Sequence, residues 1–283
     1  MAAIERIGTP QQTGLISRKT TKRPPISMVL LGALFVVFLA IPLGALLWRA
    51  LDQEHAWTYI NDPFVTEALK LSLTTSTITL VVAFLLGTPV AFLLARYKFP
   101  GHRIIETMLD LPLVLPPVVA GVALLMAFGR RGVLGNELDM LGIQLPFTTA
   151  GVVVAQIFVA APFYVRSARA GFATVSRDIE SAAQVDGATL WRVMFDISVP
   201  VAFPAMTAGA VLCWARALSE FGATLLFAGN FQGRTQTMPL AIMTAFESDL
   251  GTALAISVVL LVISFLILLA SRAITRDDSS IIG

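Results

Sequence analysis

The chain has 283 residues, of which 56% are hydrophobic and 13% are charged, and its mean hydropathy is +0.80. Soluble domains carry about 25% charged residues, so this composition excludes an ordinary soluble fold and predicts a protein that crosses a membrane several times. The net charge of +2 gives no support to a nucleic-acid partner. One cysteine and two histidines predict neither a disulfide framework nor a metal site.

Six apolar runs follow a polar, basic stretch at the start of the chain. They cover about 28–48, 71–95, 109–128, 148–165, 200–227 and 250–270, each taken as long enough to span a bilayer. We therefore expect an all-α integral membrane protein with six transmembrane helices. Its parts are an N-terminal tail (1–27), a first transmembrane helix (28–51), a core of five transmembrane helices (64–272) and a C-terminal tail (273–283).

The third run contains Pro112, Pro116 and Pro117, which remove three backbone donors. We expect this span to be broken or bent. Broken backbone at membrane depth is tolerated where it is buried in protein or lines a cavity. Pro116 and Pro117 are therefore candidates for the wall of a translocation pathway, and a packing helix with a simple kink is the alternative.

The distribution of Lys and Arg predicts the orientation of the chain. Six spans put both termini on one side, and that side carries fourteen of the basic residues while the other carries five. Basic residues accumulate in cytoplasmic loops, so both termini and the polar stretch 176–200 are expected to be cytoplasmic.

The polar stretch predicts a helix, a turn and a second short helix. Ser176 can cap the first helix, and Gly187 can end it because glycine readily adopts the left-handed conformation of a C-terminal cap. Pro200 suits the first turn of the next span. Trp191 in the second helix can enter a groove on a partner protein, and a helix resting on lipid is the alternative.

The sequence Ser181-Ala-Ala-Gln-Val-Asp-Gly187, then nine residues, then Ile197-Ser-Val-Pro200 resembles the EAA loop of ABC-importer permeases. The family's motif is Glu-Ala-Ala, three residues, Gly, nine residues and Ile-x-Leu-Pro. Its glutamate position is Ser181 here, with Glu180 one residue earlier. The resemblance covers about 67–272, and the residues to which it assigns contact with the ATPase are Glu180, Ser181, Ala182, Ala183, Gly187, Trp191, Ile197 and Pro200.

The resemblance implies a type I importer permease fold and a cell-membrane location. In this family a coupling helix inserts into a separate ATPase subunit, two such ATPases drive a pair of permeases, and an external binding protein delivers the substrate. The chain has no Gly-x4-Gly-Lys-Ser/Thr phosphate loop, so ATP and Mg are expected on the partner ATPase and no cofactor is expected on this chain. It is expected to have no catalytic residue of its own.

Arg216 and Glu220 lie four residues apart in the fifth run and can pair on one helix face. Charges within a membrane usually line a pathway or pair within a bundle, so the pair is either a gate or a structural ion pair. An attraction for an anion is the weaker interpretation, because Glu220 would neutralise Arg216.

The sequence around this pair, from Ala215 to Thr224, and the third run resemble the molybdate and sulfate branch of the family. The resemblance implies a permease for a tetrahedral oxoanion, with molybdate first and tungstate, sulfate or thiosulfate as alternatives. It also implies a homodimer and an external oxoanion-binding protein. The competing classes are a secondary transporter or channel, and a membrane enzyme. A membrane enzyme would need convergent catalytic groups, which the two separated histidines do not supply.

Overall fold

The computed structural model describes residues 25–52 and 62–277, with side chains as far as 269. The chain falls into two compact units, residues 1–45 and 46–283. Helix α1 (Ile26–Leu51) has exposed apolar side chains along most of its length and is long enough to cross a bilayer. The expected tails lie largely outside the described residues.

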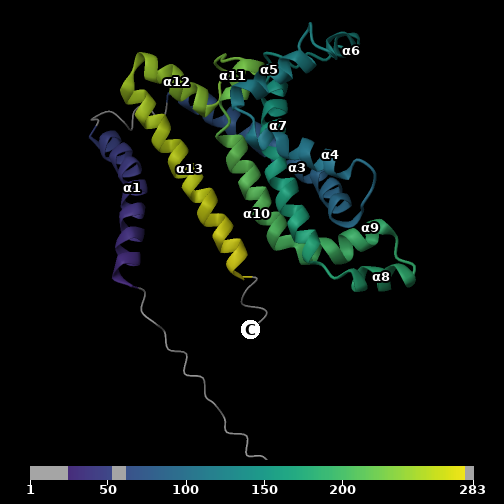
Figure 1. Ribbon diagram of the computed structural model, residues 1–283. Coiled ribbons are helices and arrows are strands. Elements are labelled where there is room, and N and C mark those ends of the chain that lie inside the picture. The colour runs from purple at the N-terminus through teal and green to yellow at the C-terminus, as the bar shows by residue number, and fades with distance from the viewer. Residues whose placement is uncertain (1–24, 53–61, 278–283) are drawn as a thin grey trace, which may run out of the picture. The chain divides into compact units, whose positions relative to one another are not determined.

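The second unit contains the rest of the helices (Figure 1). They are α3 (Pro63–Arg96), α4 (His102–Val114), α5 (Pro117–Phe128), α6 (Gly135–Met140), α7 (Thr149–Thr174), α8 (Arg177–Val185), α9 (Leu190–Arg192), α10 (Val199–Leu218), α11 (Gly222–Ala228), α12 (Met238–Ser248) and α13 (Leu250–Asp277). A π-helical segment, η1 (Val193–Ser198), joins α9 to α10. Within the described residues, five helical stretches are long and apolar enough to span a membrane.

Helix α7 is the centre of the unit and packs along both α3 and α10. Small residues permit the close approach of α7 and α10. A Cβ atom added to Gly171 would lie 2.7 Å from the Cβ of Ala205, and one added to Gly209 would lie 2.6 Å from that of Ser167. Ser167 Oγ also donates a hydrogen bond of 2.7 Å to the Ala205 carbonyl. Small side chains and interhelical hydrogen bonds are the usual means by which membrane helices associate.

Buried hydroxyl groups on α3 tie it to its neighbours. Ser76 accepts a hydrogen bond of 3.0 Å from the Trp214 indole on α10. Thr79 donates to Gln156 on α7 at 3.1 Å. Ser72 accepts from the first backbone N–H of α12, that of Met238, at 2.7 Å. These three hydroxyl groups thus pair with polar groups of neighbouring helices inside the bundle, as a lipid environment favours.

The predicted break in the third run is confirmed. Helix α4 ends at Val114 and α5 begins at Pro117, with Leu115 and Pro116 in extended conformation between them. The predicted boundary was wrong, because α4 begins seven residues before Leu109, at His102. The run is therefore two short helices, neither of which is among the five long apolar ones.

Two further predicted helix boundaries, at the end of the fifth run and before the sixth run, were also wrong. The fifth run was expected to continue to Phe227, but α10 ends at Leu218 and α11 is a separate helix. Residues 229–249 lie between the fifth and sixth predicted runs, where no helix was expected, but most of their second half forms α12. Apolar composition alone did not reveal the break after Leu218, because the residues on both sides of it are hydrophobic.

Candidate functional site

The stretch 176–200, which we call the coupling loop, begins with the nine-residue helix α8. Ser176 occupies the N-cap position, although its side chain makes no capping hydrogen bond. Gly187 has φ +89°, its N–H donates to the Gln184 carbonyl, and the Ala188 N–H donates to the Ala183 carbonyl. These two bonds form a Schellman motif, so the predicted glycine cap is confirmed.

The second helix of the coupling loop is continuous with the next span. Thr189 caps α9 by accepting a hydrogen bond from the Arg192 N–H. The helix then passes through η1 into α10, which was not predicted, and Pro200 lies in the first turn of α10. Residues Leu190–Leu218 therefore form one continuous helical stretch.

The coupling loop presents an apolar surface. Trp191 and Phe195 stack with ring centroids 5.9 Å apart and an interplanar angle of 14°. Both side chains are exposed, as are Ile179, Val185 and Leu190. Clustered aromatic and aliphatic side chains outside the core mark an interaction surface.

The predicted coupling residues do not all face outward. Ser181, Ala182, Gly187, Trp191 and Pro200 are exposed. Ala183 and Ile197 are partly buried, and Glu180 is buried.

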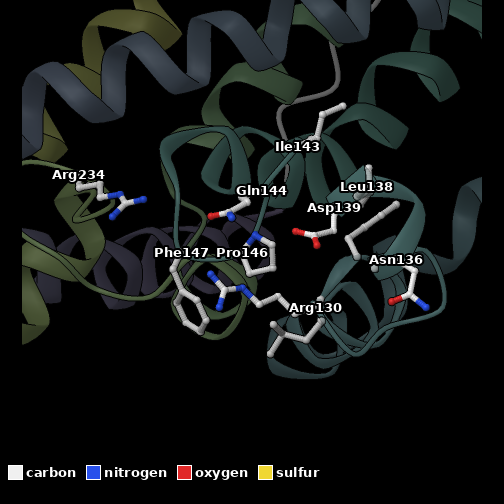
Figure 2. A pocket seen from close by; sticks show the side chains of 13 residues that line it. Arg130, Asn136, Leu138, Asp139, Ile143, Gln144, Pro146, Phe147 and Arg234 are labelled. Carbon is white, nitrogen blue, oxygen red and sulfur yellow. The ribbon is translucent and has the colours of Figure 1, made fainter. Parts of the chain in front are cut away.

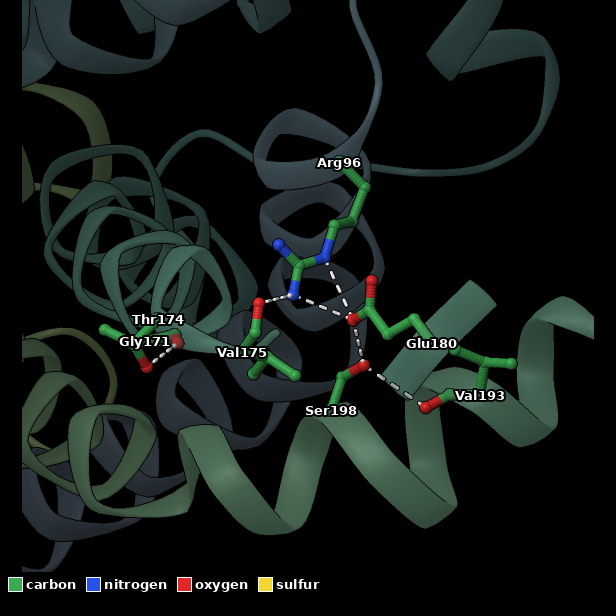
Figure 3. Close-up of polar contacts among 7 residues, drawn as sticks. All are labelled: Arg96, Gly171, Thr174, Val175, Glu180, Val193 and Ser198. Atoms are coloured by element: carbon green, nitrogen blue, oxygen red, sulfur yellow. Dashed lines mark hydrogen bonds and ion pairs between the residues drawn. The ribbon is translucent and has the colours of Figure 1, made fainter. Parts of the chain in front are cut away.

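Glu180 points into the base of the coupling loop (Figure 3). Its Oε1 accepts hydrogen bonds from Arg96 Nε at 3.0 Å, Arg96 Nη2 at 2.8 Å and Ser198 Oγ at 2.6 Å. Arg96 Nη2 also donates to the Val175 carbonyl at 3.1 Å. The structure therefore places this carboxylate against other elements of the same chain. Sequence reasoning assigned it a contact with the ATPase and did not single out Arg96 or Ser198.

The second predicted group lies at the other end of α10. The carboxylate of Glu220 is fully buried, and Arg216 Nη2 lies 2.5 Å from its Oε2. The other oxygen accepts a hydrogen bond of 2.8 Å from the Ala223 N–H, in the first turn of α11. The predicted pairing is present, but Glu220 lies just beyond the end of α10, so it joins α10 to α11.

Pro117 lies close to this joint. A Cβ atom on Gly222 would lie 2.9 Å from the Cβ of Pro117, and one on Gly121 would lie 2.7 Å from that of Leu226. Helices α5 and α11 are therefore in close contact. The structure brings Pro117 near the helix that Glu220 caps, whereas the neighbouring Pro116 is exposed.

A pocket of about 760 Å³ lies beside the first turn of α7 (Figure 2). Arg130 enters it from the turn after α5, and Arg234 enters it from the segment before α12. Asp139, Gln144 and Phe147 also line it. Among the described residues, neither arginine takes part in an ion pair. Sequence reasoning missed this pocket because its wall, formed mainly by residues 125–147, is completed by Arg234 from a distant part of the chain.

The pocket and the coupling loop lie at opposite ends of α7. Gln144 and Phe147 come just before this helix, and Ser176 comes just after it. Its 26 residues extend over about 39 Å at 1.5 Å per residue. The two surfaces are therefore separated by about the thickness of a membrane.

A bundle of membrane-spanning helices, a broken helix and an apolar loop built on a Gly-to-Pro spacing define the transmembrane component of a transporter. Residues 87–277 match the family described as binding-protein-dependent transport system inner membrane component. The chain belongs to this family. It is the multi-pass inner-membrane permease of an ABC transporter, working with ATPase and binding-protein partners, and it is not the ATPase itself.

Individual relatives place the chain within the family. The molybdenum transport system permease protein ModB of Mycobacterium tuberculosis is 42% identical over 240 residues, which are 85% of this chain and 90% of that protein. A probable sulfate transport system permease protein of Chlorokybus atmophyticus is 33% identical over 260 residues, 91% of this chain and 90% of that protein. The chain therefore falls in the molybdate, tungstate and sulfate branch.

A solved bacterial ABC transporter involved in the import of alginate has a chain of the same fold. Its TM-score is 0.71 at 21% identity, over 89% of this chain and 94% of that chain. This similarity supports the importer permease fold.

Proposed function

We propose that this chain is the permease of a molybdate importer. The observation that carries the proposal is the 42% identity to a molybdenum permease, against 33% to a sulfate permease, over most of the chain in both cases. Tungstate, which has the same charge and tetrahedral shape, is a second substrate of the same class. Sulfate or thiosulfate is the alternative.

The proposed assembly contains two copies of this chain, two ATPases and an external oxoanion-binding protein. Both termini lie in the cytoplasm, in agreement with the excess of basic residues on that side. Helices α4 and α5 together make the sixth crossing. Helix α5 has 12 residues and reaches about 18 Å, which alone is shorter than a bilayer core of about 30 Å.

The coupling loop is the proposed docking site of the ATPase. Its exposed face, with the stacked Trp191 and Phe195, offers the kind of aromatic anchor that concentrates binding energy at protein interfaces. ATP and Mg bind to the ATPase and not to this chain. ATP-driven movement of the two ATPases then acts on α10 through the continuous helix from Leu190.

The pocket lined by Arg130 and Arg234 is the proposed contact for the binding protein on the outer face. Its volume of about 760 Å³ accommodates a loop of a protein rather than one small anion. Two arginines without an ion pair among the described residues favour an acidic loop. The same charges attract an oxoanion as it is released.

The substrate is tested with the complete transporter in proteoliposomes, including the cognate ATPase and binding protein. We expect ATP-dependent uptake of radiolabelled molybdate that unlabelled molybdate and tungstate suppress at a concentration at least about tenfold lower than sulfate does, corresponding to 1.4 kcal/mol or more of selectivity. Equal or preferred uptake of radiolabelled sulfate would assign the chain to sulfate transport instead.

The docking site is tested with Gly187→Asp. This variant places a charged side chain at an exposed position with φ +89°, and we expect it to abolish uptake and co-purification with the ATPase. The matched control is Gly101→Asp, because Gly101 has φ +88°, has open space around a Cβ atom and precedes α4. Loss of ATPase binding in both variants, or in neither, would refute the assignment.

A further inference from the structure

A buried polar cluster joins the coupling loop to the helix bundle. It consists of Arg96, Glu180 and Ser198, and we call it the Arg96–Glu180–Ser198 clamp. The side chains of Arg96 and Glu180 are 7% and 9% exposed, and all three hydrogen bonds within the clamp end on one carboxylate oxygen (Figure 3). Bonds between ionised groups in such a buried setting are strong, and loss of one partner is costly.

The clamp connects elements that carry different parts of the structure. Arg96 is the last residue of α3, Glu180 lies in α8, and Ser198 is the last residue of η1. Through the carbonyl of Val175, Arg96 also holds the residue that ends α7. One carboxylate oxygen is therefore the meeting point of α3, α8 and the entrance to α10.

Helix α8 has little else to hold it to the bundle. Among its nine residues, all of which the structure describes, only Glu180 is buried. On one side it is connected through the extended residues Val175 and Ser176, and on the other through Gly187 in a left-handed conformation. Without the clamp, α8 can turn about these two connections while α3 and α10 stay in place.

The Ser198 hydroxyl adds a link to the π-helical segment. It lies 2.6 Å from Glu180 Oε1 and 3.2 Å from the carbonyl of Val193, five residues earlier. A hydroxyl has one hydrogen to donate, so these two acceptors compete for it. Withdrawal of the carboxylate frees the hydroxyl for the Val193 carbonyl inside η1. The position of α8 and the conformation of η1 are thereby coupled, and π-helical segments are frequent at functional sites.

We propose that Arg96, Glu180 and Ser198 are positioning residues that transmit movement of the coupling helix α8 to α3 and α10. The exposed face of α8 and α9 binds the ATPase, and the clamp makes that face move as one body with the spanning helices. Loss of the clamp leaves ATPase docking intact but lets α8 yield under load. The transporter then hydrolyses ATP without moving substrate, whichever oxoanion it carries.

The test is Glu180→Gln in the complete transporter, measured as oxoanion transported per ATP hydrolysed. We expect ATPase co-purification and ATP hydrolysis to stay within about twofold, and transport per ATP to fall at least about tenfold, since the amide keeps the shape of the side chain but loses the charge. The matched control is Glu106→Gln, which removes the Arg169–Glu106 ion pair between α4 and α7 without touching the coupling loop. The control is expected to keep the wild-type ratio.

The double variant Arg96→Gln with Glu180→Gln distinguishes a role of the clamp in transmitting movement from a purely structural role. It leaves no unpaired buried charge, so we expect assembly and thermal stability to recover towards wild type while transport per ATP stays several-fold low. Ser198→Ala, which removes one bond to the carboxylate, is expected to lower the ratio by a smaller factor. A wild-type ratio in all assembled variants, or a recovery of the ratio in step with stability, overturns the proposal. Failure of the wild-type transporter to carry molybdate would instead count against the proposed function.

Discussion

The Arg216→Ala variant tests whether the Arg216–Glu220 ion pair stabilises the fold. The Glu220 carboxylate is fully buried, with Arg216 Nη2 2.5 Å from one oxygen and the Ala223 N–H 2.8 Å from the other. Removal of the arginine leaves one charge-assisting donor, a backbone N–H, for a buried carboxylate. Breaking a buried pair in this way costs about 3–5 kcal/mol. For a chain of this size, such a loss lowers the unfolding temperature by roughly 10 °C.

The single cysteine provides the assay. Cys213 is buried, so a thiol-reactive dye reports its exposure as the detergent-solubilised protein is heated. Arg131→Ala is the control, because Arg131 is exposed and has no ion pair among the described residues. Arg216→Met combined with Glu220→Gln removes both charges and should recover most of the loss. If Arg216→Ala unfolds within about 1 °C of wild type, the pair does not stabilise the fold by the expected amount.

Three further predictions concern the helix contact, the docking surface and the outer pocket. Gly209→Val should destabilise the bundle by about 1–3 kcal/mol, because its Cβ would meet that of Ser167 on α7. The same dye assay measures the unfolding temperature, and an unchanged value would contradict the close packing. Trp191→Ala should weaken ATPase binding by about tenfold or more without changing the unfolding temperature; equal affinity in a titration would remove it as an anchor. The double variant Arg130→Gln with Arg234→Gln should raise the concentration of binding protein needed for half-maximal uptake by about tenfold, and this increase should be larger at low salt. A change in the maximal rate of uptake alone would show that these residues act at another step of the transport cycle.

The sequence predicts best where local backbone chemistry decides the structure. Pro116 and Pro117 lack backbone donors, and the helix breaks beside them as expected. Gly187 lacks a Cβ, and it adopts the left-handed cap conformation with both hydrogen bonds of the motif. These outcomes depend on one or two residues, so no knowledge of the surrounding packing is required.

Prediction fails where side-chain contacts that composition does not show decide the structure. The break after Leu218 is stabilised by the Glu220 carboxylate, which accepts from the N–H of Ala223 and pairs with Arg216. Composition shows only an apolar run with two charges. The pairing of those charges is predictable from their spacing, but the end of the helix between them is not. The pocket of Arg130 and Arg234 is hidden because these two residues are far apart in the chain and meet only in the folded structure.

Glu180 shows how helix geometry limits an inference from resemblance. It precedes the family's glutamate position, now Ser181, by one residue, and successive residues of a helix differ by about 100° in direction. In the structure Glu180 is buried and Ser181 is exposed, so the two side chains have different surroundings. One oxygen of the carboxylate accepts hydrogen bonds from Arg96 and Ser198 at the base of the loop, and the Glu180 side chain is only 9% exposed. The one-residue shift therefore moves the acidic group from the exposed face that we propose as the docking surface to the joint beneath it, where the proposed clamp acts.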